Sequence, residues 1–216
     1  MKICIILNGE ITDYKSIKQT IVNNNYDYII CADGGANHAY NMGIIPSYII
    51  GDLDSICNDT VEYYKNYGVK FEEFPSKKNE TDTELCIYLA NQLDASNIDF
   101  FGALGGRVDH MLVNINLLFY VRSMNIQTKI ISDKEDIYIA IDEEVLINGN
   151  KGDIVSIIPI KSDAVGVTLK DLEYPLNDYN MKYSLSLGMS NIMIKSICSI
   201  NVKKGSLLII KNKQKR

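Results

Sequence analysis

The chain has 216 residues, of which 46% are hydrophobic and 23% are charged, a composition typical of a folded protein with a hydrophobic core. Its formal net charge of −5 argues against a general attraction to nucleic acid or to an anionic membrane. The longest apolar stretches are too short to span a membrane, and the apolar start of the chain lacks the cleavage site of a signal peptide.

The cysteines indicate a reducing compartment. There are five of them, and no two have the CxxC spacing. An odd number without that spacing is not typical of a disulfide framework or of a zinc site. We therefore expect a cytoplasmic protein that binds neither nucleic acid nor a membrane.

Residues 1–133 alternate between strand-like and helix-like segments. Short apolar runs predict buried parallel strands at 2–7, 26–33, 47–52, 69–74, 98–104 and 127–132. Helical patterns lie between them at 13–25, 34–43, 58–67, 81–93 and 108–124. This alternation predicts an α/β domain with an open, parallel, Rossmann-like sheet that carries helices on both faces.

Residues 134–216 follow a different pattern, without any convincing helical segment. Strand-length runs separated by turn residues lie at 136–142, 143–149, 153–160, 164–169, 181–190, 191–197 and 206–212. The sequence therefore predicts a second, all-β domain with a sandwich or barrel-like fold. The edges of such a sheet need cover, which favours dimerisation through this domain.

Acidic residues follow several of the predicted parallel strands. Asp33 follows the second strand, Asp52 and Asp54 follow the third, and Asp109 lies shortly after the fifth. Ligands of open α/β sheets bind in the crevice beyond the carboxyl ends of the strands. We therefore expect these carboxylates to gather at one place.

Asp52 and Asp54 are predicted metal ligands. In an extended chain, side chains two residues apart point to the same side, and two neighbouring carboxylates repel each other unless a cation lies between them. Oxygen ligands without His or Cys select Mg²⁺ or Mn²⁺. The alternative interpretation is a turn, or a helix cap that begins near Asp54.

Residues 81–84 (TDTE) predict a capping box, in which Thr81 and Glu84 cap the helix that follows. Asp82 would then complement the helix dipole. A helix start that faces the crevice can also hold a phosphate or a metal ion. The two roles are compatible, so the motif leaves both open.

Two pairs of adjacent glycines, at 34–35 and 105–106, each join a strand to a helix. They can supply unusual backbone torsions, or they can let backbone N–H groups approach phosphate oxygens. The sequence contains no GxGxxG fingerprint, Walker loop or protein-kinase signature. A nucleotide would therefore be held by another arrangement.

Three basic residues lie in or near these loops. Arg107 can hold a phosphate with two hydrogen bonds, although an ordinary surface position is equally open. His38 is interpreted as a polar residue near a helix start. The role of His110 stays open.

The ordered set of motifs resembles the thiamine pyrophosphokinase family. The motifs are ADGGAN at 32–37, GDLDS at 51–55, TDTE at 81–84, GGRVDH at 105–110, LEYPL at 172–176 and GMSN at 188–191. Each motif alone is weak, but the set spans nearly the whole chain and is specific. The resemblance implies an ATP-binding catalytic domain at 1–133, a thiamine-binding and dimerisation domain at 134–216, and a homodimer with its active sites at the interface.

The resemblance also implies roles for the residues that match these motifs. Mg²⁺ would bind Asp52, Asp54 and Asp82. The catalytic residues would be Asp54, Asp82, Arg107 and Asp109, with Asp109 or a metal-bound carboxylate accepting the proton of the thiamine hydroxyl. ATP would be bound by Asp33, Gly34, Gly35, Asn37, Thr81, Arg107 and His110.

For thiamine itself, the resemblance points to three residues of the second domain. Ser190 and Asn191 would hydrogen-bond the aminopyrimidine, and Tyr174 would provide a stacking surface across the dimer. One position departs from the family, because Asn79 stands where relatives commonly carry Asp. Asn79 can ligate through its carbonyl oxygen but carries no charge.

The sequence leaves three alternative functions open. The first is a pyrophosphokinase that acts on another heteroaromatic alcohol, such as a hydroxymethylpterin. The second is a Mg²⁺-dependent phosphatase, which is disfavoured because its acidic motif would follow the first strand, where this chain has Asn8. The third is a nucleotide sensor without catalysis, which has little need for so many acids at strand ends.

Overall fold

A computed structural model describes residues 1–74 and 79–213. The chain divides into two compact units, Met1–Asp133 and Lys134–Arg216. This division coincides with the change of sequence pattern after residue 133. The helices of the described residues include none that is long and apolar enough to cross a membrane.

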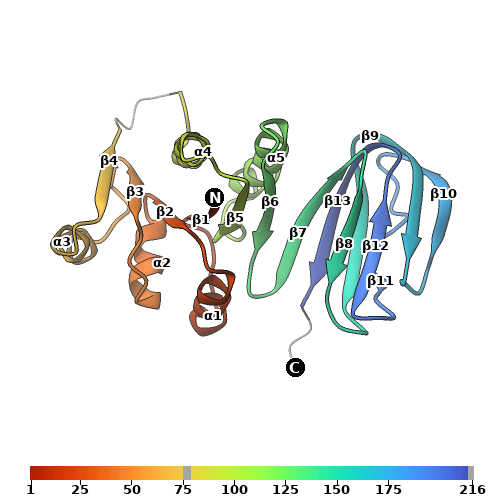
Figure 1. The fold of residues 1–216 in the computed structure, drawn as a ribbon, viewed down its shortest axis with the longest axis horizontal. Coiled ribbons are helices and arrows are strands. Elements are labelled where there is room, and N and C mark those ends of the chain that lie inside the picture. Colours follow the sequence, from red (N-terminus) through yellow and green to blue (C-terminus); the bar gives the residue numbers. More distant parts are fainter. Residues whose placement is uncertain (75–78, 214–216) are drawn as a thin grey trace. The chain divides into compact units, whose positions relative to one another are not determined.

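The first unit alternates strands and helices along the chain (Figure 1). Its strands are β1 (Lys2–Ile6), β2 (Tyr28–Ala32), β3 (Tyr48–Gly51), β4 (Lys70–Glu73), β5 (Asn97–Phe101) and β6 (Gln127–Ile131). Its helices are α1 (Tyr14–Asn24), α2 (Gly35–Met42), α3 (Asn58–Asn66), α4 (Asp82–Gln92) and α5 (Val108–Ser123). All of the strands and helices predicted for this part are present.

The strands of the first unit form a parallel sheet in the order β4-β3-β2-β1-β5-β6. The chain builds outward from β1 to β4 on one side and continues with β5 and β6 on the other. Helices α1, α2 and α3 lie on one face of the sheet, and α4 and α5 lie on the other (Figure 1). The order reverses between β1 and β5, and such a switch point is where open α/β sheets bind their ligands. The predicted Rossmann-like fold is confirmed.

Helix α2 begins directly against the end of β1. A Cβ added at Gly35 would lie 2.1 Å from the carbonyl oxygen of Ile6, so no larger residue fits at this point. Ala36 and Ala39 of the same helix are fully buried in the core beneath the sheet. Small residues therefore fix the first turn of α2 close to the carboxyl ends of the strands.

The second unit is an antiparallel sandwich, as predicted. Its strands are β7 (Glu135–Ile141), β8 (Glu144–Asn148), β9 (Ile154–Lys170), β10 (Leu176–Met181), β11 (Asn191–Ile192), β12 (Ile197–Asn201) and β13 (Lys204–Asn212). The first half of β9 pairs with β13 and β11, and its second half pairs with β10 and β12. A positive φ of 71° at Lys161 marks the bend between the halves, so one strand belongs to both layers of the sandwich.

Several strands of this unit differ from the sequence prediction. The runs at 153–160 and 164–169 are joined in β9, and β10 lies in a segment that the pattern did not mark as a strand. The predicted strand at 181–190 is wrong, since β10 ends at Met181 and an irregular segment follows. Its alternating apolar side chains Tyr183, Leu185 and Leu187 are exposed instead of half-buried.

Candidate functional site

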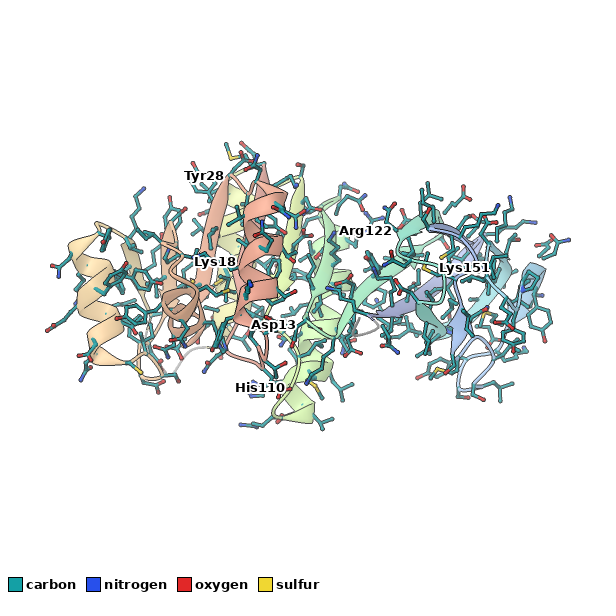
Figure 2. All side chains as sticks on the ribbon, turned by 90° about the horizontal axis from the view of Figure 1, so that it is seen from below. Asp13, Lys18, Tyr28, His110, Arg122 and Lys151 are labelled. Atoms are coloured by element: carbon teal, nitrogen blue, oxygen red, sulfur yellow. The ribbon has the colours of Figure 1, made fainter. Side chains whose placement is uncertain are left out.

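A cavity of about 790 Å³ lies at the switch point of the parallel sheet. It is formed by the segments that follow β1, β2 and β5 and by the starts of α4 and α5. In Figure 2, His110 at the start of α5 lies at the edge of the sheet opposite to Tyr28, with which β2 begins. Six of the residues predicted for the site line this cavity, namely Asp33, Thr81, Asp82, Arg107, Asp109 and His110.

Three carboxylates form a group that can hold a metal ion. Asp33, Asp52 and Asp54 each offer an oxygen atom, and these oxygens lie within 4.8 Å of one another. Asp33 comes from the end of β2, and the other two come from the loop after β3. The expected gathering of strand-end acids is therefore present for Asp33, Asp52 and Asp54, whereas neither Asp109 nor Asp82 belongs to this group.

Asp33 is half-buried and has an unusual environment. Its backbone has a positive φ of 41°, and its Oδ1 is buried without a hydrogen-bond partner. Burial raises the pKa of Asp33, and the negative charges of Asp82 and Asp52 raise it further, whereas hydrogen bonds from Ser55 and the Gly34 N–H lower it. A buried carboxylate oxygen without a partner, surrounded by other carboxylates, favours a cation at this point.

Asp82 lies at the start of α4. The predicted capping box is confirmed, because the Thr81 hydroxyl accepts from the Glu84 N–H and the Glu84 carboxylate accepts from the Thr81 N–H at 2.7 Å. Thr81 and Asp82 also line the cavity. The start of α4 thus faces the crevice, so Asp82 can also contact a phosphate or a metal ion bound there.

The two glycine pairs serve different purposes. Gly34 has an ordinary helical φ of −56°, and a Cβ there would strike the side chain of Asn8 at 2.3 Å. Gly105 and Gly106 have positive φ values of 83° and 73°. The first pair therefore permits close packing of α2 on β1, and the second permits a tight loop with backbone torsions that favour glycine.

Arg107 and Asp109 form a bidentate ion pair at the start of α5. The Nε and Nη2 atoms of Arg107 donate to the two carboxylate oxygens of Asp109 at 3.1 and 2.6 Å. Arg107 lowers the pKa of the Asp109 carboxyl through these hydrogen bonds. Both side chains are exposed toward solvent and line the cavity, so the guanidinium is close to any phosphate bound there.

Asn8, Glu10 and Asn114 also line the cavity, and the sequence reasoning missed them as site residues. Asn8 and Glu10 follow β1 in the way that Asp33 follows β2, so the same strand-end signal was available for them. Asn114 lies within α5 and donates to the carbonyl oxygen of Ala103 at 2.8 Å. Its position in a helix carries no comparable signal in the sequence.

His38 has the satisfied polar role that was expected. Its Nε2 is 2.7 Å from the carbonyl oxygen of Gly9, and its Nδ1 is 2.8 Å from the Tyr14 hydroxyl. Burial lowers the pKa of His38. The neutral ring, with Nε2 donating to Gly9 and Nδ1 accepting from Tyr14, satisfies both partners and holds the loop after β1.

Gly34, Gly35 and Asn37 are not among the described residues that line the cavity. Both glycines are buried, and the side chain of Asn37 bonds to the loop that carries the acidic residues. As contacts of ATP these three residues stay predictions. Their observed contacts are with the protein itself.

The three residues expected to bind thiamine lie near one another in the second unit. Asn191 is 2% exposed and makes hydrogen bonds to both backbone polar groups of Tyr174. The side chain of Tyr174 is exposed, and the exposed Ser190 donates its backbone N–H to the Ser156 hydroxyl at 3.1 Å. Asn191 thus supports the Tyr174 backbone, while Tyr174 and Ser190 face solvent.

Two family models match this chain. Residues 20–130 match the catalytic domain of thiamin pyrophosphokinase, and residues 135–207 match the vitamin B1 binding domain of the same family. The first match covers the acidic residues and the lining of the cavity apart from residues 7–10. The second covers Tyr174, Ser190 and Asn191.

Individual relatives agree with these matches. Thiamine pyrophosphokinase from Bacillus subtilis is 30% identical over 184 residues, which cover 85% of this chain and 86% of the relative. Thiamine pyrophosphokinase 1 from Oryza sativa subsp. japonica is 30% identical over 189 residues, covering 76% and 71%. The crystal structure of the Bacillus subtilis protein matches with a TM-score of 0.88 and 28% identity over the full length of both chains. The resemblance seen in the sequence is confirmed, and this chain belongs to the thiamin pyrophosphokinase family.

Proposed function

We propose that this chain is a thiamine pyrophosphokinase, which transfers the terminal pyrophosphoryl group of ATP to the hydroxyl of thiamine. A bond forms between the thiamine oxygen and the β-phosphorus, the bond from that phosphorus to the α-phosphate oxygen breaks, and AMP leaves. The products are thiamine diphosphate, AMP and a proton. Membership of the family supports this activity and favours neither a pterin substrate nor a phosphatase.

The main observation in support of this proposal is the group of three carboxylates beside the cavity. A protein that binds a triphosphate at strand ends gains nothing from this negative charge unless a cation accompanies the nucleotide. The donor atoms are all oxygens, and the buried Oδ1 of Asp33 has no hydrogen-bond partner. These residues fit Mg²⁺, which prefers carboxylate oxygens.

We assign the binding of Mg²⁺ to Asp52 and Asp54, with Asp33 and Asp82 as the other candidate ligands. Asp82 stays in this set because its charge acts on Asp33 and because it lines the same cavity. When bound, Mg²⁺ would neutralise charge on the phosphate oxygens during transfer. The segments that follow β2 and β3 hold these acids at the separation that the ion requires.

Arg107 is the group proposed to hold the moving pyrophosphoryl group. A guanidinium can make two parallel hydrogen bonds to phosphate oxygens, as it does to Asp109 in this structure. Phosphoryl transfer depends mainly on positioning and on neutralising charge. Asp109 orients Arg107 through these two hydrogen bonds, which also lower the pKa of the Asp109 carboxyl.

Thiamine is proposed to bind to the second unit through Tyr174 and Ser190. The exposed ring of Tyr174 offers a flat surface for stacking. The nearby Ser190 offers hydrogen-bonding groups for the aminopyrimidine. Asn191 acts through the Tyr174 backbone, to which its amide is already bonded.

We further propose a homodimer located in the cytoplasm. Both units expose clustered apolar side chains, with Val108, Leu112 and Val113 in α5 of the first and residues 183–189 in the second. Exposed apolar clusters of this kind are typical of interaction surfaces. All five cysteines are free thiols, which agrees with a reducing compartment.

The direct test is incubation of the protein with ATP, Mg²⁺ and thiamine, followed by mass detection of the products. Formation of AMP and thiamine diphosphate in equal amounts supports the proposal. Formation of ADP and thiamine monophosphate would contradict transfer of a pyrophosphoryl group. A parallel reaction with a hydroxymethylpterin should give no AMP above background, and release of phosphate without thiamine would indicate a phosphatase.

A further inference from the structure

Asn37 of helix α2 bonds to the loop that carries two of the three clustered carboxylates. Its Nδ2 donates to the carbonyl oxygen of Ser55 at 2.8 Å, and its Oδ1 accepts from the backbone N–H of Cys57 at 3.1 Å. One amide thus joins two backbone groups on either side of Ile56. Both halves of the Asn37 amide therefore have partners in this loop, and one of the two residues, Ser55, lines the cavity.

The loop needs support of this kind. Leu53 has a positive φ of 64°, which is unfavourable for a leucine. Asp52 and Asp54 flank it, and their negative charges lie close to that of Asp33. Mutual repulsion favours a wider separation of these carboxylates, so contacts elsewhere in the loop must hold it in place.

Two contacts fasten the loop to α2. Ile56 is buried in the same core cluster as Ala36 and Ala39 of the helix. This packing anchors the loop in the hydrophobic core. Asn37 provides the polar contact. Because α2 follows directly after Asp33, these contacts connect the segment that carries Asp33 to the loop that carries the other two acids.

We propose that Asn37 is a positioning residue, which sets the separation between the Asp33 carboxylate and those of Asp52 and Asp54 and thereby the affinity for a divalent cation. This inference rests on the proposed function of the acidic group as a metal site. It differs from the expectation that Asn37 binds ATP. Residues that orient metal ligands in this way contribute about 10- to 100-fold to metal affinity or activity.

The test is the binding of Mn²⁺ alone to the full chain, measured by electron paramagnetic resonance without ATP or thiamine. The variants are Asn37→Ala, which removes both hydrogen bonds, and Asn37→Asp, which keeps the acceptor for Cys57 but loses the donor to Ser55. We expect the Kd for Mn²⁺ to rise about 10- to 100-fold in both variants. The matched controls are Asn23→Ala and Asn23→Asp in α1, whose side chain accepts a hydrogen bond from Gln19, and these should leave the Kd unchanged.

A second readout needs neither metal nor activity. In hydrogen–deuterium exchange, the backbone amide of Cys57 should exchange faster in Asn37→Ala and remain protected in Asn37→Asp, which retains the acceptor. Peptides from α1 should exchange at the same rate in all variants. This measurement reports the contact itself, so it remains informative if one variant loses stability.

Three results would overturn the proposal. Mn²⁺ binding within about twofold of wild type in both variants would exclude the positioning role while leaving the metal site intact. Tighter binding in Asn37→Asp than in wild type would mean that the added negative charge, and not the hydrogen bond to Ser55, controls the affinity for the cation. Absence of Mn²⁺ binding by the wild-type chain would remove the metal site and, with it, both this inference and that part of the proposed function.

Discussion

The side-chain amide of Asn191 pairs with both backbone polar groups of Tyr174. Its Oδ1 accepts the Tyr174 N–H at 2.9 Å, and its Nδ2 donates to the Tyr174 carbonyl oxygen at 2.7 Å. Asn191 is 2% exposed, whereas Tyr174 is 63% exposed. A buried residue therefore fixes the backbone from which an exposed aromatic ring projects.

Replacing Asn191 with Ala should weaken thiamine binding specifically. Loss of both hydrogen bonds frees the Tyr174 backbone, so that its ring is no longer held in position for stacking. We therefore expect the KM for thiamine to rise about 10-fold or more, with little change in the KM for ATP. Steady-state kinetics with each substrate varied in turn would measure this difference. The exposed Asn177 of β10 is the control, and Asn177→Ala should change neither KM.

A double variant separates the indirect role of Asn191 from direct contact. If Asn191 acts through Tyr174, the effects of Asn191→Ala and Tyr174→Ala on the KM for thiamine should not add. Full additivity would mean that the two residues contribute independently. An equal rise in both KM values for Asn191→Ala would contradict the assignment of the second unit to thiamine.

Replacing Asp54 with Ala should reduce kcat by at least about 100-fold, because loss of a metal carboxylate removes several kcal/mol of transition-state stabilisation. Asp54 is exposed, so the free energy of unfolding should change little. Activity assays across a range of Mg²⁺ concentrations, with urea unfolding of the same sample, provide the measurement. Asp59→Ala in the first turn of α3 is the control, and near-normal turnover of the Asp54 variant would remove that residue from the metal site.

Two conservative substitutions can distinguish the catalytic roles of Arg107 and Asp109. Arg107→Lys should lose about 100-fold in kcat, because an ammonium group cannot make the paired hydrogen bonds of a guanidinium. Asp109→Asn retains an acceptor for Arg107 and should cost about 10-fold or less if Asp109 only orients the guanidinium. The pH dependence of kcat in single-turnover experiments distinguishes the roles. A loss of several orders of magnitude in Asp109→Asn would identify it as the general base instead.

The burial of His38 should make the stability of the first unit depend on pH. Because burial lowers the pKa of His38 in the folded state, the unfolded chain binds the proton first, near pH 6.5. The contribution of the neutral ring is therefore fully present above about pH 6.5 and decreases as the pH falls toward the folded-state pKa. Urea unfolding at pH 5 to 8 should show this loss, and His38→Gln should reduce it.

The exposed His110 provides the comparison for this experiment. His110→Gln should leave the dependence of the unfolding free energy on pH close to that of wild type. If His38→Gln and wild type have the same dependence between pH 5 and 8, the buried imidazole does not control acid stability. A matching change in Tyr14→Phe would support the hydrogen bond from Tyr14 to His38 as part of the cause.

Much of the first unit could be predicted from the sequence because its signals are local. Buried parallel strands are apolar on both faces, and each ends in a polar residue that marks the ligand edge of the sheet. Asp33, Asp52 and Asp54 were located in this way, and the capping box at Thr81 was found from four consecutive residues. The order of the strands within the sheet was not predicted and comes from the structure.

The supporting hydrogen bonds could not be predicted in the same way. Asn37 and His38 contact loops that are distant in the sequence, and nothing in their own neighbourhood shows which backbone groups they meet. The strand predicted at 181–190 was wrong for a related reason. Alternating apolar residues form a strand only where a partner strand is present. Tyr183 and Leu185 belong to such an alternating pattern, but their side chains are exposed.

Strand β9 passes through both layers of the second unit. The layers are therefore joined by continuous backbone as well as by side-chain packing. Neither layer can separate from the other without distorting that strand. This unit should lose its structure in one cooperative step, with no state in which a single layer survives.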